Sequence, residues 1–258
     1  MAMVIAIANQ KGGVGKTTTT VNLAHALVER GKTVLMVDAD PQASLTTYLG
    51  HDADRLEEEE RTLYFAIIEG KPLSSLIIEG NPALVPSSIR LASAEPELIG
   101  NLLTSPQNVL RTRIKEIRGR FDYVLIDCTP SLGLLTINAL VAADRVVIPS
   151  ETEYLSSKGI RLLLNTIEKI QVGLNPELEV LGVLPTKYNQ RFLHDNAVLS
   201  GVQAGMNDRG IRVFAPVARS TAFSKASIEA KATVLATPDA PGVDSYYKLA
   251  DEIIAYGS

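Results

Sequence analysis

The sequence predicts an α/β fold: a doubly wound, mostly parallel sheet with helices on both faces. Two observations support this prediction. Short β-branched runs recur along the chain, and stretches with the apolar spacing of helices separate several of them. The chain has 258 residues, of which 46% are hydrophobic and 21% charged, and no linker-like or low-complexity segment divides it. We therefore expect a single domain over residues 1–258.

The runs that we predict as buried parallel strands are bounded by turn or polar residues. They cover residues 4–8, 33–37, 123–126, 145–149, 180–184, 212–217 and 233–236. Val21, Ala24, Leu27 and Val28 have helical spacing, and Gly31 follows them as a C-terminal cap. Further helices are predicted after the N-cap residue Thr62, as far as residue 68, and over residues 243–256.

Composition favours a cytoplasmic protein. The only cysteine, Cys128, excludes an internal disulfide and any site built from paired cysteines, which favours a reducing compartment. No apolar run reaches the roughly 18 residues that a membrane span requires. The N-terminus "MAMVIAIANQ" lacks the features of a signal peptide. We expect no membrane partner.

The segment "NQKGGVGKTT" has the context of a phosphate-binding loop, because a predicted strand precedes it and a helix follows it. Glycines let successive N–H groups turn inward toward phosphate oxygens, and the helix N-terminus adds positive potential. Lys16 is expected to reach the β- and γ-phosphates, and the Thr17 hydroxyl to ligate Mg²⁺. The residues predicted to bind the nucleotide are Lys11, Gly12, Gly13, Val14, Gly15, Lys16, Thr17 and Thr18.

The loop departs from the standard pattern, since Gln10 stands where the first glycine belongs and a second lysine, Lys11, follows it. In this it resembles the deviant loop of the ParA/MinD group of P-loop ATPases. The signature lysine of that group reaches across a dimer interface to the nucleotide of the partner subunit, and Lys11 occupies its position. The resemblance implies ATP as the nucleotide and an ATP-dependent homodimer.

Two further motifs resemble the switches of the same family. "VLMVDADPQASLT" at residues 34–46 matches the first switch, whose second aspartate, here Asp40, positions the attacking water. "FDYVLIDCTPSLGLLTINAL" at residues 121–140 matches the second switch, in which Asp127 ends an apolar strand and holds a water of the Mg²⁺ shell. The resemblance therefore implies Lys11, Lys16 and Asp40 as catalytic residues.

The branch of the family follows from what the chain lacks. The iron-protein and cluster-carrier branches need paired cysteines. The MinD branch ends in a basic membrane-binding helix, whereas residues 243–256 carry one lysine against three acids. We therefore expect the last helix to pack in the core or in a dimer. "VVIPSETEYLSSKGIRLLLNTI" and "GVLPTKYNQR" resemble the ParA/Soj chromosome and plasmid partition ATPases, whose ATP dimer binds DNA without sequence preference.

The charge distribution agrees with a nucleic-acid partner. The net charge is −4, yet the segment of residues 187–231, called the basic segment below, carries seven basic residues against three acidic ones. By position, Arg191 and Arg219 match the phosphate-contacting arginines of the ParA/Soj branch. Lys225 and Lys231 extend the predicted DNA-binding patch.

The resemblance implies a nucleoid-associated cytoplasmic ATPase. Its ATP-sandwich dimer binds nonspecific DNA, and a ParB-like or other partner protein stimulates hydrolysis and release, which segregates DNA or positions a cargo. Two alternatives stay open. One is a metabolic ATP-dependent synthetase or kinase that uses the same loop and does not bind DNA. The other is a nucleotide-gated scaffold without hydrolysis, against which the presence of Asp40 weighs.

Overall fold

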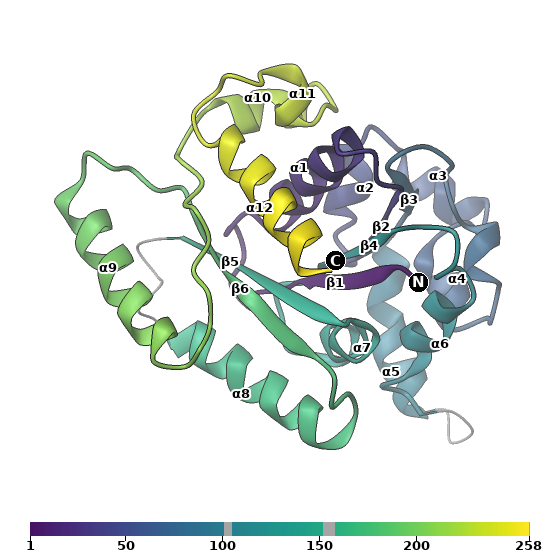
Figure 1. Cartoon of the computed structure of the whole chain (residues 1–258). Coiled ribbons are helices and arrows are strands. Elements are labelled where there is room, and N and C mark those ends of the chain that lie inside the picture. The colour runs from purple at the N-terminus through teal and green to yellow at the C-terminus, as the bar shows by residue number, and fades with distance from the viewer. Residues whose placement is uncertain (101–104, 152–157, 258) are drawn as a thin grey trace.

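The computed structural model describes residues 1–100, 105–151 and 158–257 (Figure 1). Within these ranges a six-stranded sheet has the order β3-β2-β4-β1-β5-β6, and every neighbouring pair is parallel. Its strands are β1 (Met3–Ile7), β2 (Val34–Ala39), β3 (Ala83–Val85), β4 (Tyr123–Cys128), β5 (Arg145–Glu151) and β6 (Glu179–Thr186). The predicted doubly wound α/β fold is confirmed.

Helices cover both faces of the sheet, and each face has its own apolar cluster (Figure 1). One face carries α1 (Lys16–Glu29), α2 (Ser44–Tyr48), α10 (Ala222–Ile228), α11 (Thr233–Ala236) and α12 (Val243–Tyr256). The other carries α4 (Leu63–Ile67), α5 (Ala94–Gly100), α6 (Val109–Lys115), α7 (Leu134–Ala142), α8 (Lys158–Gly173) and α9 (Leu193–Asn207). A short helix, α3 (Ala53–Glu58), lies in the connection from β2 to β3.

The side chains of β1 point alternately to the two faces of the sheet, which explains why helices must pack on both faces. Val4 and Ala6 belong to one cluster and Ile5 and Ile7 to the other, and all four are fully buried. Successive strand side chains point to opposite faces, so a strand that is apolar throughout must be covered twice. β1 is therefore a central parallel strand that is buried on both faces.

The predicted first and last helices are confirmed, and they pack against each other. α1 ends at Glu29 before Gly31, whose φ of +76° is the left-handed conformation expected of a helix C-terminal cap. α12 buries Val243, Tyr246 and Ala250 in the cluster that also contains α1. The last helix is therefore a core-packing helix. None of the helices in the described ranges has the length and apolar character needed to cross a membrane.

The predicted strand at residues 212–217 is wrong. Its backbone begins to pair with β6, since Val183 N donates to Arg212 O at 2.9 Å and Phe214 N donates to Val183 O at 2.9 Å. The next two bonds of a parallel ladder need N–H groups at residues 185 and 216, and both residues are prolines. Val217 N donates to Pro185 O instead, so the register breaks and only an isolated bridge forms.

The predicted strand at residues 233–236 is also wrong, because this segment is the helix α11. Val234 is buried, and its backbone N–H donates to Asn22 Oδ1 on α1 at 3.0 Å. This tertiary contact outweighs the β propensity of threonine and valine. The structure also adds β3, a three-residue strand that the sequence analysis missed, while the helix predicted after Thr62 is confirmed as α4.

Candidate nucleotide site

The glycine-rich loop lies between the central strand β1 and helix α1. β1 pairs with β4 on one side and with β5 on the other. The strand order reverses at such a position, and ligands of open α/β sheets bind there, at the carboxyl ends of the strands. The loop therefore lies where the fold offers a binding crevice.

Contacts to the neighbouring strands hold the loop in place. Asn9 Nδ2 donates to Pro149 O of β5 at 2.7 Å, and Thr186 Oγ1 of β6 donates to Val14 O at 2.9 Å. Gly13 and Gly15 have φ values of +75° and +89°, a left-handed conformation that residues with a Cβ rarely adopt. These glycines are required for the turn that leads directly into α1.

Lys16 and Thr17 open helix α1 and face the loop and β4. Lys16 is buried, and its Nζ donates to Lys11 O at 3.2 Å. Burial lowers the pKa of Lys16, and the negative charges of Asp127 and Asp40 oppose that shift. Thr17 Oγ1 donates to Asp127 Oδ2 at 2.7 Å. The structure thus brings the predicted residues of the loop and of both switches together.

Two buried aspartates lie side by side at the ends of β2 and β4. Asp38 and Asp127 are register partners, and both are almost fully buried. Burial raises the pKa of Asp38 to about 6, against hydrogen bonds from Thr46. Burial and then the charge of Asp38 raise the pKa of Asp127.

This donor set fits a magnesium ion. Mg²⁺ prefers oxygen ligands, and the Thr17 hydroxyl and the Asp127 carboxylate supply them within one hydrogen bond of each other. A cation would also offset the negative charge of the two buried carboxylates. Thr17 and Asp127 are therefore the residues of this chain that could hold Mg²⁺.

Asp40 lies just beyond the end of β2 and is held by the backbone. Asp40 N donates to Asp38 Oδ1 at 3.2 Å, while Gln42 N donates to Asp40 Oδ1 at 3.0 Å. Asp38 in turn accepts from the backbone N–H and the hydroxyl of Thr46, at 2.8 and 2.7 Å. The sequence analysis missed this role of Asp38, which ties the segment around Asp40 to the next helix.

Lys11 lies at the outer lip of the loop, and its ammonium pairs with Glu151 at the end of β5. Lys187, directly after β6, pairs with the same carboxylate. The sequence analysis predicted neither the ion pair of Lys11 with Glu151 nor that of Lys187 with Glu151. Glu151 lies two residues beyond the strand predicted at 145–149, so the prediction ended too early to place its carboxylate at a strand end.

The predicted DNA-binding arginines lie on two loops that touch each other. Tyr188 and Ala218 form an isolated parallel bridge, and Arg219 N donates to Tyr188 O at 2.8 Å. Arg191 belongs to the same turn, where its N–H donates to Asn189 Oδ1 at 3.1 Å. Both arginines are exposed.

The remaining predicted DNA residues lie on and after α10. Lys225 is exposed on that helix, and Lys231 follows it. Among the residues that the structure describes, ion pairs to carboxylates join three members of the basic segment: Lys187 to Glu151, Arg212 to Glu252, and Lys231 to Glu229. The excess of positive charge that the sequence suggested is therefore partly neutralised within the chain.

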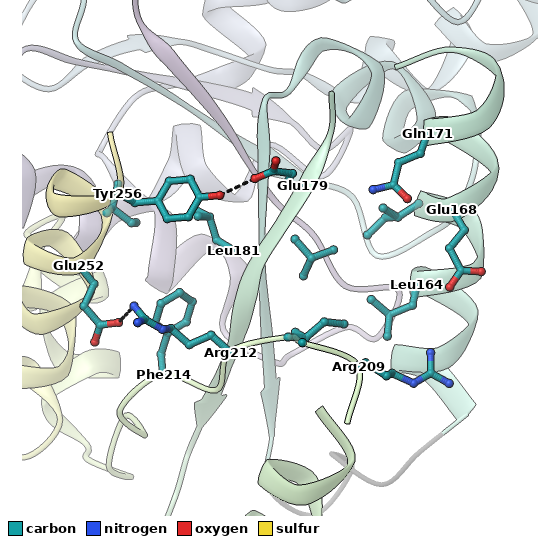
Figure 2. Close-up of a pocket in the computed structure, with 15 residues that line it drawn as sticks. Leu164, Glu168, Gln171, Glu179, Leu181, Arg209, Arg212, Phe214, Glu252 and Tyr256 are labelled. Atoms are coloured by element: carbon teal, nitrogen blue, oxygen red, sulfur yellow. Dashed lines mark hydrogen bonds and ion pairs between the residues drawn. The ribbon is translucent and has the colours of Figure 1, made fainter. Parts of the chain in front are cut away.

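A hollow of about 730 Å³ lies far from the loop, between α8, the first residues of β6 and the end of α12 (Figure 2). Two pairs of its lining side chains are bonded to each other, as Tyr256 Oη donates to Glu179 Oε2 at 2.5 Å and Arg212 Nη1 to Glu252 Oε2 at 2.6 Å. Because β6 starts here and ends beside the loop, the hollow is at the opposite edge of the sheet.

Comparison with known proteins places the chain in a family. A family model described as an AAA domain matches residues 2–180. Soj of Bacillus subtilis, a sporulation initiation inhibitor protein, is 39% identical over 100% of both chains. The chromosome-partitioning ATPase Soj of Thermus thermophilus is 38% identical over 97% of this chain and 95% of its own.

The chain is also similar over nearly its whole length to a protein of solved structure. Cobyrinic acid a,c-diamide synthase from Mycobacterium smegmatis, with bound ADP and magnesium, has a TM-score of 0.83 and 36% identity over 98% of this chain and 94% of its own. Residues 152–157, part of one motif that suggested the partition branch, lie outside the described residues. The loop, the two switches and the full-length similarity together assign the chain to the ParA/Soj/MinD family of P-loop ATPases, as a partition ATPase of the ParA/Soj type.

Proposed function

We propose that this ATPase forms an ATP-sandwich dimer that binds nonspecific DNA. A ParB-like or other partner protein then stimulates hydrolysis and releases the dimer, which segregates DNA or positions a cargo. The observation that carries the proposal is the pair of lysines in one loop: Lys16 is buried inside it, whereas the Lys11 side chain is 36% exposed on its outer lip.

The two lysines have different tasks in this proposal. The ammonium of Lys16 faces the loop interior, where it neutralises the β- and γ-phosphates of the nucleotide of its own chain. A second cation on the same phosphates adds little, so Lys11 serves the nucleotide of the facing subunit. Thr17 and, through water, Asp127 would hold Mg²⁺, which would supply positive charge for the phosphates during phosphoryl transfer.

Asp40 positions the attacking water. Its backbone contacts fix the carboxylate, and its charge acts on Lys16, which supports a position close to the transferred phosphate. Positioning and electrostatic stabilisation dominate phosphoryl transfer. A site that needs groups from a second subunit or a partner protein therefore hydrolyses ATP slowly without them. This slow turnover leaves room for a stimulating partner protein.

The DNA-binding face is proposed around Arg191 and Arg219, with Lys225 and Lys231 as outer members. Exposed arginines on two joined loops suit phosphate contacts, which carry no sequence information. A protein with this activity works in the cytoplasm, on the nucleoid.

A metabolic synthetase is the second candidate, because the similar M. smegmatis structure is that of a synthase. Such an enzyme needs a substrate cavity beside the nucleotide. The hollow of Figure 2 instead lies at the far edge of the sheet, away from the loop. The full-length similarity to chromosome-partitioning proteins of bacteria favours the partition function.

Binding to DNA decides between the two candidates. The protein with ATP and Mg²⁺ should bind DNA fragments of unrelated sequence with similar affinity, and binding should fall steeply with salt. With ADP it should bind weakly. ATP-loaded protein that dimerises but ignores DNA, and whose turnover rises with a small metabolite, would instead establish the synthetase.

A further inference from the structure

The ammonium group of Lys11 lies against a carboxylate of its own chain. Lys11 Nζ is 2.8 Å from Glu151 Oε2, and Lys187 Nζ forms an ion pair with the other oxygen, Oε1. The exposed fraction of the Glu151 side chain is 16%, against 36% for Lys11 and 45% for Lys187. One partly buried carboxylate therefore holds two lysines, one on each oxygen.

The fold builds this arrangement from three strands. Glu151 is the last residue of β5 and the register partner of Thr186 on β6. Lys187 follows with a φ of +54°, a left-handed conformation that a residue with a Cβ keeps only where its surroundings hold it. The lip of the loop is fixed too, since Lys11 N donates to Asn9 Oδ1 at 3.0 Å.

We propose that Glu151 is a latch that holds Lys11 in its own subunit until a second ATP-loaded copy arrives. Lys187 keeps the carboxylate paired when Lys11 leaves for the phosphates of the partner. This inference rests on the proposed function, because it requires a dimer in which Lys11 contacts the nucleotide of the facing chain.

Lys187 allows Lys11 to leave Glu151, because it keeps the carboxylate paired. Removing one member of a partly buried ion pair normally leaves an uncompensated charge. Here Glu151 keeps one lysine after the other has left, while Lys11 gains a triphosphate, which carries more negative charge than a carboxylate. Burial raises the pKa of Glu151, but the hydrogen bonds from Lys11 and Lys187 outweigh it and lower the pKa, so the latch is charged at neutral pH.

Two substitutions should move the dimer in opposite directions. Glu151→Gln keeps the shape and removes the charge, so the ion pair that holds Lys11 is lost and dimerisation tightens. An ion pair of this exposure is worth up to about fivefold, and the two chains of a dimer each release one Lys11, so we expect up to about 25-fold. Lys187→Met leaves Glu151 with Lys11 alone, so dimerisation weakens.

The double variant separates a latch from a general change in charge. Lys187 acts only through Glu151 in this proposal, so Lys187→Met should have little effect when Glu151→Gln is already present. A general effect of charge on the interface would be additive. The dimer dissociation constants of the four proteins are measured by sedimentation with Mg²⁺ and AMPPNP, a nonhydrolysable ATP analogue.

Labelling of nucleotide-free protein tests the latch without the dimer. An amine-reactive ester modifies lysines that are not engaged in an ion pair, and mass spectrometry reports the rate at each position. Glu151→Gln should raise the labelling of Lys11 about threefold to fivefold. Lys248, whose ion pair with Asp244 at 2.9 Å is untouched, is the internal control.

Unchanged labelling of Lys11 together with an unchanged AMPPNP dimer in Glu151→Gln would overturn the latch alone. A weaker dimer in Glu151→Gln would also overturn it, because Glu151 would then be orienting Lys11 for the partner. A parent protein that stays monomeric with AMPPNP would overturn the proposed function and the latch together.

Discussion

Replacing Asp40 by alanine should separate ATP hydrolysis from ATP binding. The carboxylate lies outside the loop that contacts the phosphates, and it accepts a hydrogen bond from Gln42 N at 3.0 Å. Losing a side chain that positions a nucleophile typically lowers turnover by about 10²–10⁴, which is about 2.7–5.4 kcal/mol of barrier. Phosphate contacts and dimerisation should remain.

The cost in stability should be much smaller. Losing the bond from Gln42 removes about 1–2 kcal/mol. Removing Asp40 also relieves its repulsion of two neighbours, because its charge helps raise the pKa values of Asp38 and Asp127. The two effects have opposite signs, so we expect a change in the free energy of unfolding of about 1 kcal/mol or less.

Phosphate release and dimer fraction should be measured on the same samples. Asp52→Ala is a matched control, since it also removes an aspartate that accepts backbone N–H groups, from Asp54 and Arg55 at 3.1 Å each, at the exposed start of α3. It should cost about 1 kcal/mol of stability and leave hydrolysis unchanged. An Asp40→Ala protein that dimerises and still releases phosphate at the parent rate would remove Asp40 from the mechanism.

Three other predictions concern the DNA face, pH and packing. Arg191→Glu or Arg219→Glu should weaken binding to all DNA sequences alike and reduce the salt slope by about one per lost contact, without affecting the ATP dimer; parent-like binding would place the face elsewhere. Burial raises the pKa of Asp38 from an unfolded value near 3.9 to about 6, so the folded state binds the extra proton. Nucleotide-free protein should therefore lose stability as pH rises from 4 through 6, by up to about 1.4 kcal/mol per unit in denaturant titrations, and Asp38→Asn should flatten the loss. Gly182→Ala should cost about 1–3 kcal/mol in the same assay, because its Cβ would lie 2.6 Å from Arg212 O, and a neutral result would contradict the close packing.

The sequence predicted those parts of the fold that depend on local pattern. β1, β2, β4, β5 and β6 are continuous apolar runs, and α1 and α12 have clear helical spacing with glycines at their ends. Residues 212–217 have the same local pattern as a strand. They fail to become one because two successive bonds of the ladder fall on Pro185 and Pro216, which is visible only once the register with β6 is known.

The candidate site also contains residues that the sequence could predict and residues that it could not. The phosphate loop is contiguous, so Lys16 and Thr17 could be assigned from spacing alone. Glu151 is 140 residues away from Lys11, and its contact depends on β5 lying beside β1. The paired aspartates likewise follow from the register of β2 with β4, which one sequence does not specify.

The central claim is that Lys11 serves the nucleotide of a second chain, and dimerisation of a Lys11→Ala variant tests it most directly. Light scattering should be measured with ATP and Mg²⁺, beside ATP affinity, for the parent, Lys11→Ala and Lys16→Ala. We predict that Lys11→Ala keeps substantial ATP affinity but stays monomeric, whereas Lys16→Ala loses nucleotide binding itself. A Lys11→Ala protein that dimerises with ATP as the parent does would contradict the account.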